Sequence, residues 1–176
     1  KTEYCSLETW ISDHSIQRAL LEVVIDIPGI NSTRVYSTHL SHRSLETRLP
    51  QVKFLQKIIN QAPYEQGAWS GDHSEPIEGW TEGEKPPMPE QFILMGDMNF
   101  TLDSKEYKII VDSKKFHDAW TSSETDRGTN VDGDSIDHCF VSKNILPKIK
   151  RTYIDRNISA SDHWPLWMEM DIENKN

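Results

Sequence analysis

Four short polar runs of the sequence combine residue types that can act on a phosphoester. They are Ser37-Thr38-His39-Leu40, Gly96-Asp97-Met98-Asn99, Ile136-Asp137-His138 and Ser161-Asp162-His163. Cleavage of a phosphoester needs a cation that offsets the phosphate charge, a base that activates water, and donors that stabilise the transition state. Carboxylates can bind the cation, an imidazole can act as the base, and an amide or imidazole N–H can donate hydrogen bonds to the transition state. The four runs therefore predict most of a metal-assisted site.

Each polar side chain has a chemical role for which its type is suited. Asp97 and Asp162 offer hard oxygen ligands or carboxylates that orient water. Asn99 offers an amide N–H to a phosphoryl oxygen, while its carbonyl oxygen can face a metal. His163 is the natural proton carrier, because an imidazole titrates at about pH 6.5. Asp137 would orient that imidazole through its second nitrogen.

Further cationic and hydrogen-bonding side chains follow two of the runs. His39 and His42 are additional donors for the oxygens of a phosphate. Arg43 is expected to contact substrate, and Arg48 and Arg127 are other basic residues that can bind a phosphate.

The hydrophobic pattern predicts a crossover that positions the first two runs. The expected elements are an antiparallel hairpin over residues 19–27 and 33–40, a helix over residues 48–60, and a buried strand over residues 91–96. Two parallel strands joined by a helix end at the same edge of a sheet. We therefore expect His39 and Asp97 to arrive together.

Two further strands are expected over residues 136–142 and 165–172, and in each a polar run lies at or just before the beginning of the strand. If they are antiparallel to the first pair, their starts meet the ends of the other strands, and all four runs share one edge. The pattern indicates an α/β fold in a single domain over residues 1–176, interrupted by a long polar loop over residues 61–90.

The composition of the sequence indicates which kinds of binding partner are favoured. The 176 residues are 36% hydrophobic with six Trp, which is enough for one core, and their formal charge is −9. That charge disfavours nonspecific nucleic-acid binding and favours a small-molecule or lipid-linked phosphoester. The sequence contains no apolar run near the roughly 18 residues of a membrane span, and its two cysteines leave the compartment open.

In this order the motifs resemble those of the endonuclease/exonuclease/phosphatase superfamily, over roughly residues 18–172. The resemblance implies part of a four-layered α/β/β/α sandwich with a mixed, largely antiparallel sheet, and a Mg²⁺-dependent phosphodiesterase or phosphatase, with Mn²⁺ as an alternative. It implies that Asp97 and Asn99 position water and phosphate, and that Asp137 and His163 form an Asp–His pair. It also implies that Asp162 helps hold the metal and that His39 contacts the phosphate. Arg127-Gly128-Thr129 fits a polar loop of the family.

The sequence departs from the family pattern before Ala19. A further half-sandwich, with an Asn and a metal-binding Glu, has no match there. We therefore expect a C-terminal part of a longer catalytic domain, which needs its missing N-terminal segment and has little activity alone. Three alternatives stay open: a structure-selective nuclease of the same family, a dinuclear Zn or Mn hydrolase, and a catalytically inactive binding domain on this fold.

Overall fold

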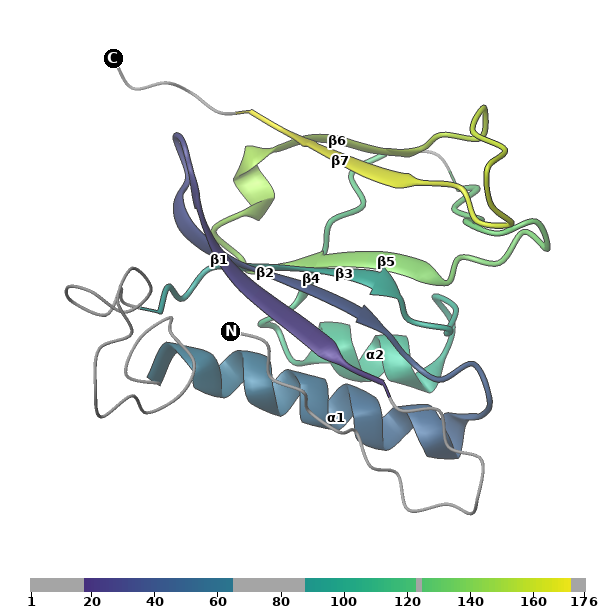
Figure 1. Cartoon of the computed structure of the whole chain (residues 1–176), viewed down its shortest axis with the longest axis horizontal. Helices are drawn as coiled ribbons and strands as arrows, with labels where there is room; N and C mark the ends of the chain where they lie inside the picture. The colour runs from purple at the N-terminus through teal and green to yellow at the C-terminus, as the bar shows by residue number, and fades with distance from the viewer. Residues whose placement is uncertain (1–17, 65–87, 123–124, 172–176) are drawn as a thin grey trace, which may run out of the picture.

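The computed structural model describes residues 18–64, 88–122 and 125–171. These residues form three layers, in which two helices cover one face of a five-stranded sheet and a two-stranded sheet lies over the other face (Figure 1). In chain order the elements are β1 (Leu20–Ile27), β2 (Asn31–His39), α1 (Leu45–Gln61), η1 (Ala62–Tyr64), β3 (Phe92–Asp97), α2 (Lys105–Asp112), β4 (His117–Asp118), β5 (Asp137–Val141), η2 (Leu146–Lys148), β6 (Ile149–Ile154) and β7 (Leu166–Met170).

The larger sheet has the strand order β1-β2-β3-β5-β4. Strands β2 and β3 are parallel, and the other three neighbouring pairs are antiparallel. The predicted hairpin, crossover and mixed, largely antiparallel sheet are thus confirmed. The register pairs His39 with Asp97 and Asp97 with Asp137.

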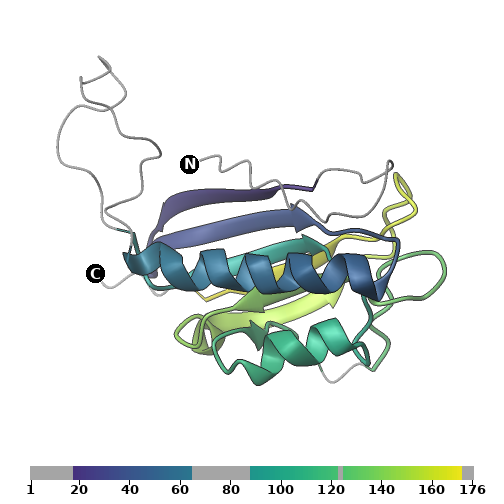
Figure 2. The same cartoon turned by 90° about the horizontal axis from the view of Figure 1, so that it is seen from below.

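Helix α1 begins three residues before the predicted start at Arg48. Ser44 caps it, because the Ser44 hydroxyl accepts a hydrogen bond from the Thr47 N–H, and Glu46 adds a favourable charge in the first turn. Val52 and Leu55 are buried against the sheet. Helix α2 runs beside α1 on the same face (Figure 2), and contacts between the two helices fix their spacing.

Both faces of the central strands are covered. Tyr36, Leu94 and Phe140 pack with the helices in one core cluster. Ile93 and Val141 belong to a second cluster, which packs against apolar residues of the two-stranded sheet. Because successive side chains of a strand point to opposite faces, burial on both sides explains why Phe92, Ile93 and Leu94 are all apolar.

The structure differs from the prediction in where the last strand lies. Strand β7 was expected at the edge shared by the other polar runs, but it pairs with β6 in the second sheet. Helix α2 and strands β4 and β6 were not predicted at all. A loop was expected over residues 61–90. Residues 65–87 of it lie outside the described residues, and its first residues, Gln61 to Tyr64, are helical. Neither helix of the described ranges is long and apolar enough to cross a membrane.

Candidate active site

Three neighbouring strands place polar side chains at one edge of the large sheet. His39 ends β2, Asp97 ends β3 and Asp137 begins β5, and the register puts these three residues side by side. The ladder continues one step further, because the Met98 N–H donates to the Ile136 carbonyl at 2.8 Å. The edge is therefore held by backbone hydrogen bonds on both sides of Asp97.

Asp97, Asp137 and His163 form what we call the Asp–Asp–His cluster. One ligand atom from each of the three side chains lies within 4.8 Å of the others, and all three residues are partly buried. The His39 Nε2 lies 3.3 Å from the Asp97 Oδ2, and the His39 side chain is 56% exposed. His39 thus borders the cluster from the solvent side.

Gly96 lets β3 approach β2 closely beside the cluster. Its φ of +146° is rarely adopted by other residues, and a Cβ on Gly96 would lie 1.9 Å from the Thr38 carbonyl oxygen. The glycine of the Gly-Asp-x-Asn run is therefore required by the backbone, one residue before the catalytic candidate Asp97.

Asn99 fixes the orientation of Asp97. Its backbone N–H donates to the Asp97 Oδ1 at 2.9 Å, and its side-chain amide donates to the Leu40 carbonyl at 3.0 Å. Its φ is +52°, a left-handed conformation that Asn tolerates better than most residues. Asn99 therefore ties the end of β3 to the end of β2.

His163 reaches the cluster from the segment between β6 and β7. Its Nδ1 lies 2.8 Å from the Asp137 Oδ2. This segment pairs with residues 129–131, since the Trp164 N–H donates to the Thr129 carbonyl at 2.7 Å and the Val131 N–H donates to the Asp162 carbonyl at 3.0 Å. The sequence prediction that Asp137 and His163 converge is matched by this geometry.

Thr129 links the two halves of the Asp–His pair. Its buried hydroxyl accepts hydrogen bonds from the N–H groups of Asp137, at 3.1 Å, and Ile136, at 3.2 Å, while its carbonyl holds the segment that carries His163. From the sequence, Thr129 is predicted only to belong to a polar loop. Its position shortly before the Ile-Asp-His run was the one available signal.

The surroundings of His163 favour its protonated form. Partial burial lowers the pKa of His163, but the hydrogen bond to Asp137 and the charges of Asp137, Asp97 and Asp162 outweigh burial and raise the pKa above its usual value. Because Nδ1 faces a carboxylate, Nε2 is the nitrogen that remains to exchange a proton with another group.

The remaining predicted site residues lie around the cluster rather than in it. Asp162 is exposed, accepts a hydrogen bond from the Ser161 hydroxyl at 3.2 Å, and is not a member of the Asp–Asp–His cluster. His42 and Arg43 are exposed in the loop after β2. The His42 Nδ1 lies 3.5 Å from the Arg18 Nη2, and the Arg43 backbone N–H donates to the Ser41 hydroxyl.

Arg48 and Arg127 are held by carboxylates and brace the fold. Arg48 pairs with Glu106 at 2.9 Å, and Arg127 makes two hydrogen bonds to Asp118, at 2.8 and 3.1 Å. Burial raises the pKa of Asp118, but hydrogen bonds from Arg127 and Tyr107 outweigh burial and lower the pKa overall. These guanidinium groups are therefore already paired.

His138 points away from the cluster, although it follows Asp137 directly. It is buried, its Nε2 lies 2.7 Å from the Phe100 carbonyl, and its ring stacks on Phe100. Burial lowers the pKa of His138, so this imidazole is neutral and its Nε2–H donates to the carbonyl. His138 belongs to the core beneath the site.

A cavity of about 640 Å³ adjoins the cluster on the side of the second sheet. Asp137 and His163 line it together with apolar residues, among them Trp164, Leu166 and Trp167. Its size falls in the range of cavities that bind small molecules. The polar cluster thus opens onto a space with an apolar wall.

Comparison with known proteins agrees with this fold. Residues 59–163 match the model of the Endonuclease/Exonuclease/phosphatase family. No curated protein sequence matches the chain. Among solved structures, the chain is similar to the endonuclease/exonuclease/phosphatase from Bacteroides vulgatus, with a TM-score of 0.56 and 20% identity over 81% of this chain and 50% of that chain.

Two other solved structures show the same likeness. The structure from Beutenbergia cavernae DSM 12333 gives a TM-score of 0.55 and 19% identity, over 88% of this chain and 39% of that chain. The endonuclease domain of TRAS1, a telomere-specific non-LTR retrotransposon, gives a TM-score of 0.54 and 12% identity, over 86% of this chain and 68% of that domain. At these identities the likeness concerns the fold, and the chain spans about half the length of the first structures it matches. Because the family model covers more than half of its residues, the chain belongs to the endonuclease/exonuclease/phosphatase family.

Proposed function

We propose that this chain carries the C-terminal part of a Mg²⁺-dependent phosphoester hydrolase. Membership of the family supports a phosphoesterase or nuclease in general terms. The observation that carries the finer proposal is the hydrogen bond of 2.8 Å between His163 and Asp137, with the Asp97 carboxylate in the same cluster.

His163 is the proton carrier of the proposed reaction. Asp137 holds its Nδ1–H and leaves Nε2 to take a proton from water or give one to a leaving group. Asp97 orients the attacking water through the Oδ2 atom, because Asn99 holds the Oδ1 atom. His39, beside Asp97, donates a hydrogen bond to a phosphoryl oxygen. His42 and Arg43 contact the substrate from the loop after β2.

The donor set of the cluster fits a hard divalent cation. Two carboxylates and one imidazole lie within 4.8 Å of one another, and Mg²⁺ is usually bound in proteins by one or two carboxylates. Asp97 would hold it together with Asp162, the residue directly before His163, and Mn²⁺ accepts the same ligands. When bound, the cation offsets the charge of the phosphoryl oxygens. The cluster holds one imidazole and that of His39 borders it, whereas a dinuclear Zn site usually has several histidine ligands in contact with the metals.

The substrate we propose is a small or lipid-linked phosphoester. The net charge of −9 opposes long-range attraction of a nucleic acid, and Arg48 and Arg127 are paired with carboxylates. The apolar wall of the adjoining cavity would contact the uncharged part of the ester.

An apolar face of the large sheet suggests where the rest of the catalytic domain packs. Leu21, Val23 and Ile25 of β1 are exposed, as are Met95 of β3 and Trp167 of β7. Large exposed apolar side chains that recur along one face of a strand, as in β1, are typical of a surface that another part of a protein covers. We propose that an N-terminal segment of the longer catalytic domain covers it.

Hydrolysis of bis(p-nitrophenyl) phosphate and p-nitrophenyl phosphate by the full-length protein tests this function. We expect activity that is lost in EDTA, returns with Mg²⁺ and does not return with Zn²⁺. Asp97→Asn should abolish most of it, whereas Asp112→Asn, at an exposed position at the end of α2, should not. Wild-type activity in EDTA would contradict the proposed metal dependence, activity that returns with Zn²⁺ would favour the dinuclear Zn alternative, and no activity under any condition would favour the inactive binding domain.

A further inference from the structure

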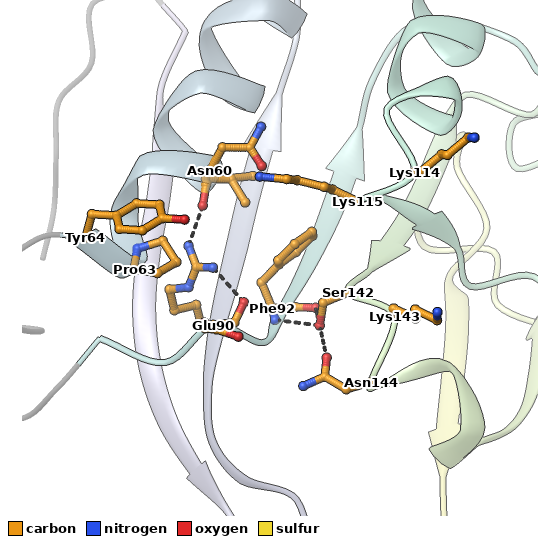
Figure 3. Close-up of a pocket in the computed structure, with 12 residues that line it drawn as sticks. Asn60, Pro63, Tyr64, Glu90, Phe92, Lys114, Lys115, Ser142, Lys143 and Asn144 are labelled. Carbon is orange, nitrogen blue, oxygen red and sulfur yellow. Dashed lines mark hydrogen bonds between the residues drawn. The ribbon is translucent and has the colours of Figure 1, made fainter.

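A second cavity lies at the opposite end of the same strands, where β2 and β3 begin their pairing (Figure 3). Its volume is about 660 Å³, which is also in the range of small-molecule sites. The register pairs Arg34 with Phe92 at this end and His39 with Asp97 at the other. Five residue steps along a strand separate the two ends by roughly 16 Å. The cavity is therefore a separate place from the Asp–Asp–His cluster.

Basic residues gather around this cavity. Lys114, Lys115, Lys143 and Arg34 line it, and Glu90 is the one acidic residue among the lining residues. The whole sequence has a net charge of −9, so this cavity is positively charged in a protein that is negatively charged overall. We call this space the lysine cavity.

Two tight turns bring the lysines to the edge of the cavity. At the end of α2, Lys114 adopts a φ of +58° and its N–H donates to the Val111 carbonyl at 3.2 Å, which turns the chain toward Lys115. After β5, a turn closed by the Ile145 N–H and the Ser142 carbonyl at 3.0 Å carries Lys143. The pairing of β4 with β5 holds these turns side by side.

Hydrogen-bonding side chains at fixed positions line the same space. The Ser142 hydroxyl accepts from the Phe92 N–H at 3.0 Å and donates to the Asn144 Oδ1 at 2.7 Å, as Figure 3 shows. The Asn144 amide in turn donates to the Gln91 side chain at 3.1 Å. On the other side, the Tyr64 side chain is 85% exposed, so its ring is available to a ligand.

Arg34 contributes a buried positive charge to the lining. The residue is 1% exposed, and its guanidinium donates to the Tyr36 hydroxyl and to the carbonyls of Ile59 and Glu90. Across residues 18–64, 88–122 and 125–171 no carboxylate forms an ion pair with it, and its buried Nε–H has no acceptor. The buried Glu22 carboxylate lies near Tyr36, because its charge raises the pKa of that hydroxyl. A buried cation with neutral partners is incompletely compensated and favours an anion nearby.

We propose that the lysine cavity binds a small phosphorylated molecule at a site separate from the active centre. Lys115 reaches toward Asn60 (Figure 3) and supplies a point charge for a phosphate, while Lys114 and Lys143 add positive charge at the edge of the cavity. The side-chain amides of Asn60 and Asn144 supply N–H donors. The ring of Tyr64 offers a surface for the organic part of the ligand. Neither the proposed hydrolysis nor its metal depends on this site.

Amide chemical shifts of the full-length protein test the proposal directly. Inorganic phosphate is added in EDTA, so that no metal assists binding elsewhere, with NaCl adjusted to keep the ionic strength constant. We expect saturable shifts of the Lys115, Ser142 and Asn144 amides. The double substitution Lys115→Glu and Lys143→Glu should weaken the apparent affinity at least tenfold. Lys108→Glu, on the exposed side of α2, should change it less than twofold.

A parallel arm identifies the source of the phosphate. If the wild-type protein sediments with vesicles that contain phosphatidic acid and the double variant does not, the site is supported and its ligand is a lipid headgroup. Shifts with free phosphate and no sedimentation would support the site and assign a soluble ligand. Absence of saturable shifts, shifts confined to residues near Asp97 and His163, or equal affinity in the double variant would overturn the proposal.

Discussion

Asp97 and Asp137 are register partners across the antiparallel pair β3 and β5, at the point where that pair reaches the edge of the sheet. The third member of the cluster, His163, comes from a different sheet and reaches Asp137 through a hydrogen bond of 2.8 Å. The candidate active site therefore depends on how the segment before β7 is attached to the large sheet.

Loss of the Thr129 hydroxyl should loosen the Asp–His pair. Thr129→Val keeps the shape but removes the acceptor for the N–H groups of Ile136 and Asp137. Leaving these partly buried donors unpaired should lower the free energy of unfolding by about 1–3 kcal/mol and also reduce kcat. Thr129→Ser should restore most of both, as measured by urea unfolding and steady-state kinetics. Equal kcat and stability in the Val and Ser variants would contradict the role of this hydroxyl.

Asp137→Asn should shift the pH dependence as well as the rate. When His163 acts as a base, kcat/KM rises with pH through the pKa of His163, which its carboxylate neighbours raise above 6.5. Removal of the Asp137 charge lowers that pKa, so the acid limb of the profile should move to lower pH. The maximal rate should fall by about 10²–10⁴-fold, because the imidazole loses its orientation. A limb that stays in place would mean that another group titrates.

Gly96 and Gly133 give a matched pair of glycine substitutions. Gly96→Ala puts a Cβ 1.9 Å from the Thr38 carbonyl oxygen at a φ of +146°, and should cost at least about 3 kcal/mol. Gly133→Ala, at a φ of +83° with no atom within 4 Å of the new Cβ, should cost only about 1–2 kcal/mol. Thermal or urea unfolding compares them, and similar losses would show that the close approach of β2 and β3 is not limiting.

Sequence patterns were sufficient for the elements with strong periodicity. The hairpin of β1 and β2, the long amphipathic helix and the buried strand β3 were all predicted, and their order alone places His39 beside Asp97. Helix α2 was missed because it is short and polar at its exposed positions, and Glu106, one of its buried residues, is charged.

The position of β7 could not be predicted, because alternation of apolar residues shows that a strand has a buried face but not which sheet it joins. The Pro165 to Met170 stretch alternates correctly, yet its partner β6 carries Lys150 and Arg151 and has a weaker pattern. The convergence of Asp137 with His163 was nevertheless anticipated, since both sheets bring their polar runs to the same side of the molecule. The role of Thr129 required coordinates, because a hydroxyl that accepts two backbone N–H groups leaves no periodic signal.

The rate of Mg²⁺-dependent hydrolysis of bis(p-nitrophenyl) phosphate by the full-length His163→Ala variant tests the central proposal most directly. If His163 carries the proton, kcat should fall at least ~10²-fold relative to wild type, while the melting temperature stays within a few degrees. A folded variant that keeps the wild-type rate within twofold would contradict the assignment of this site.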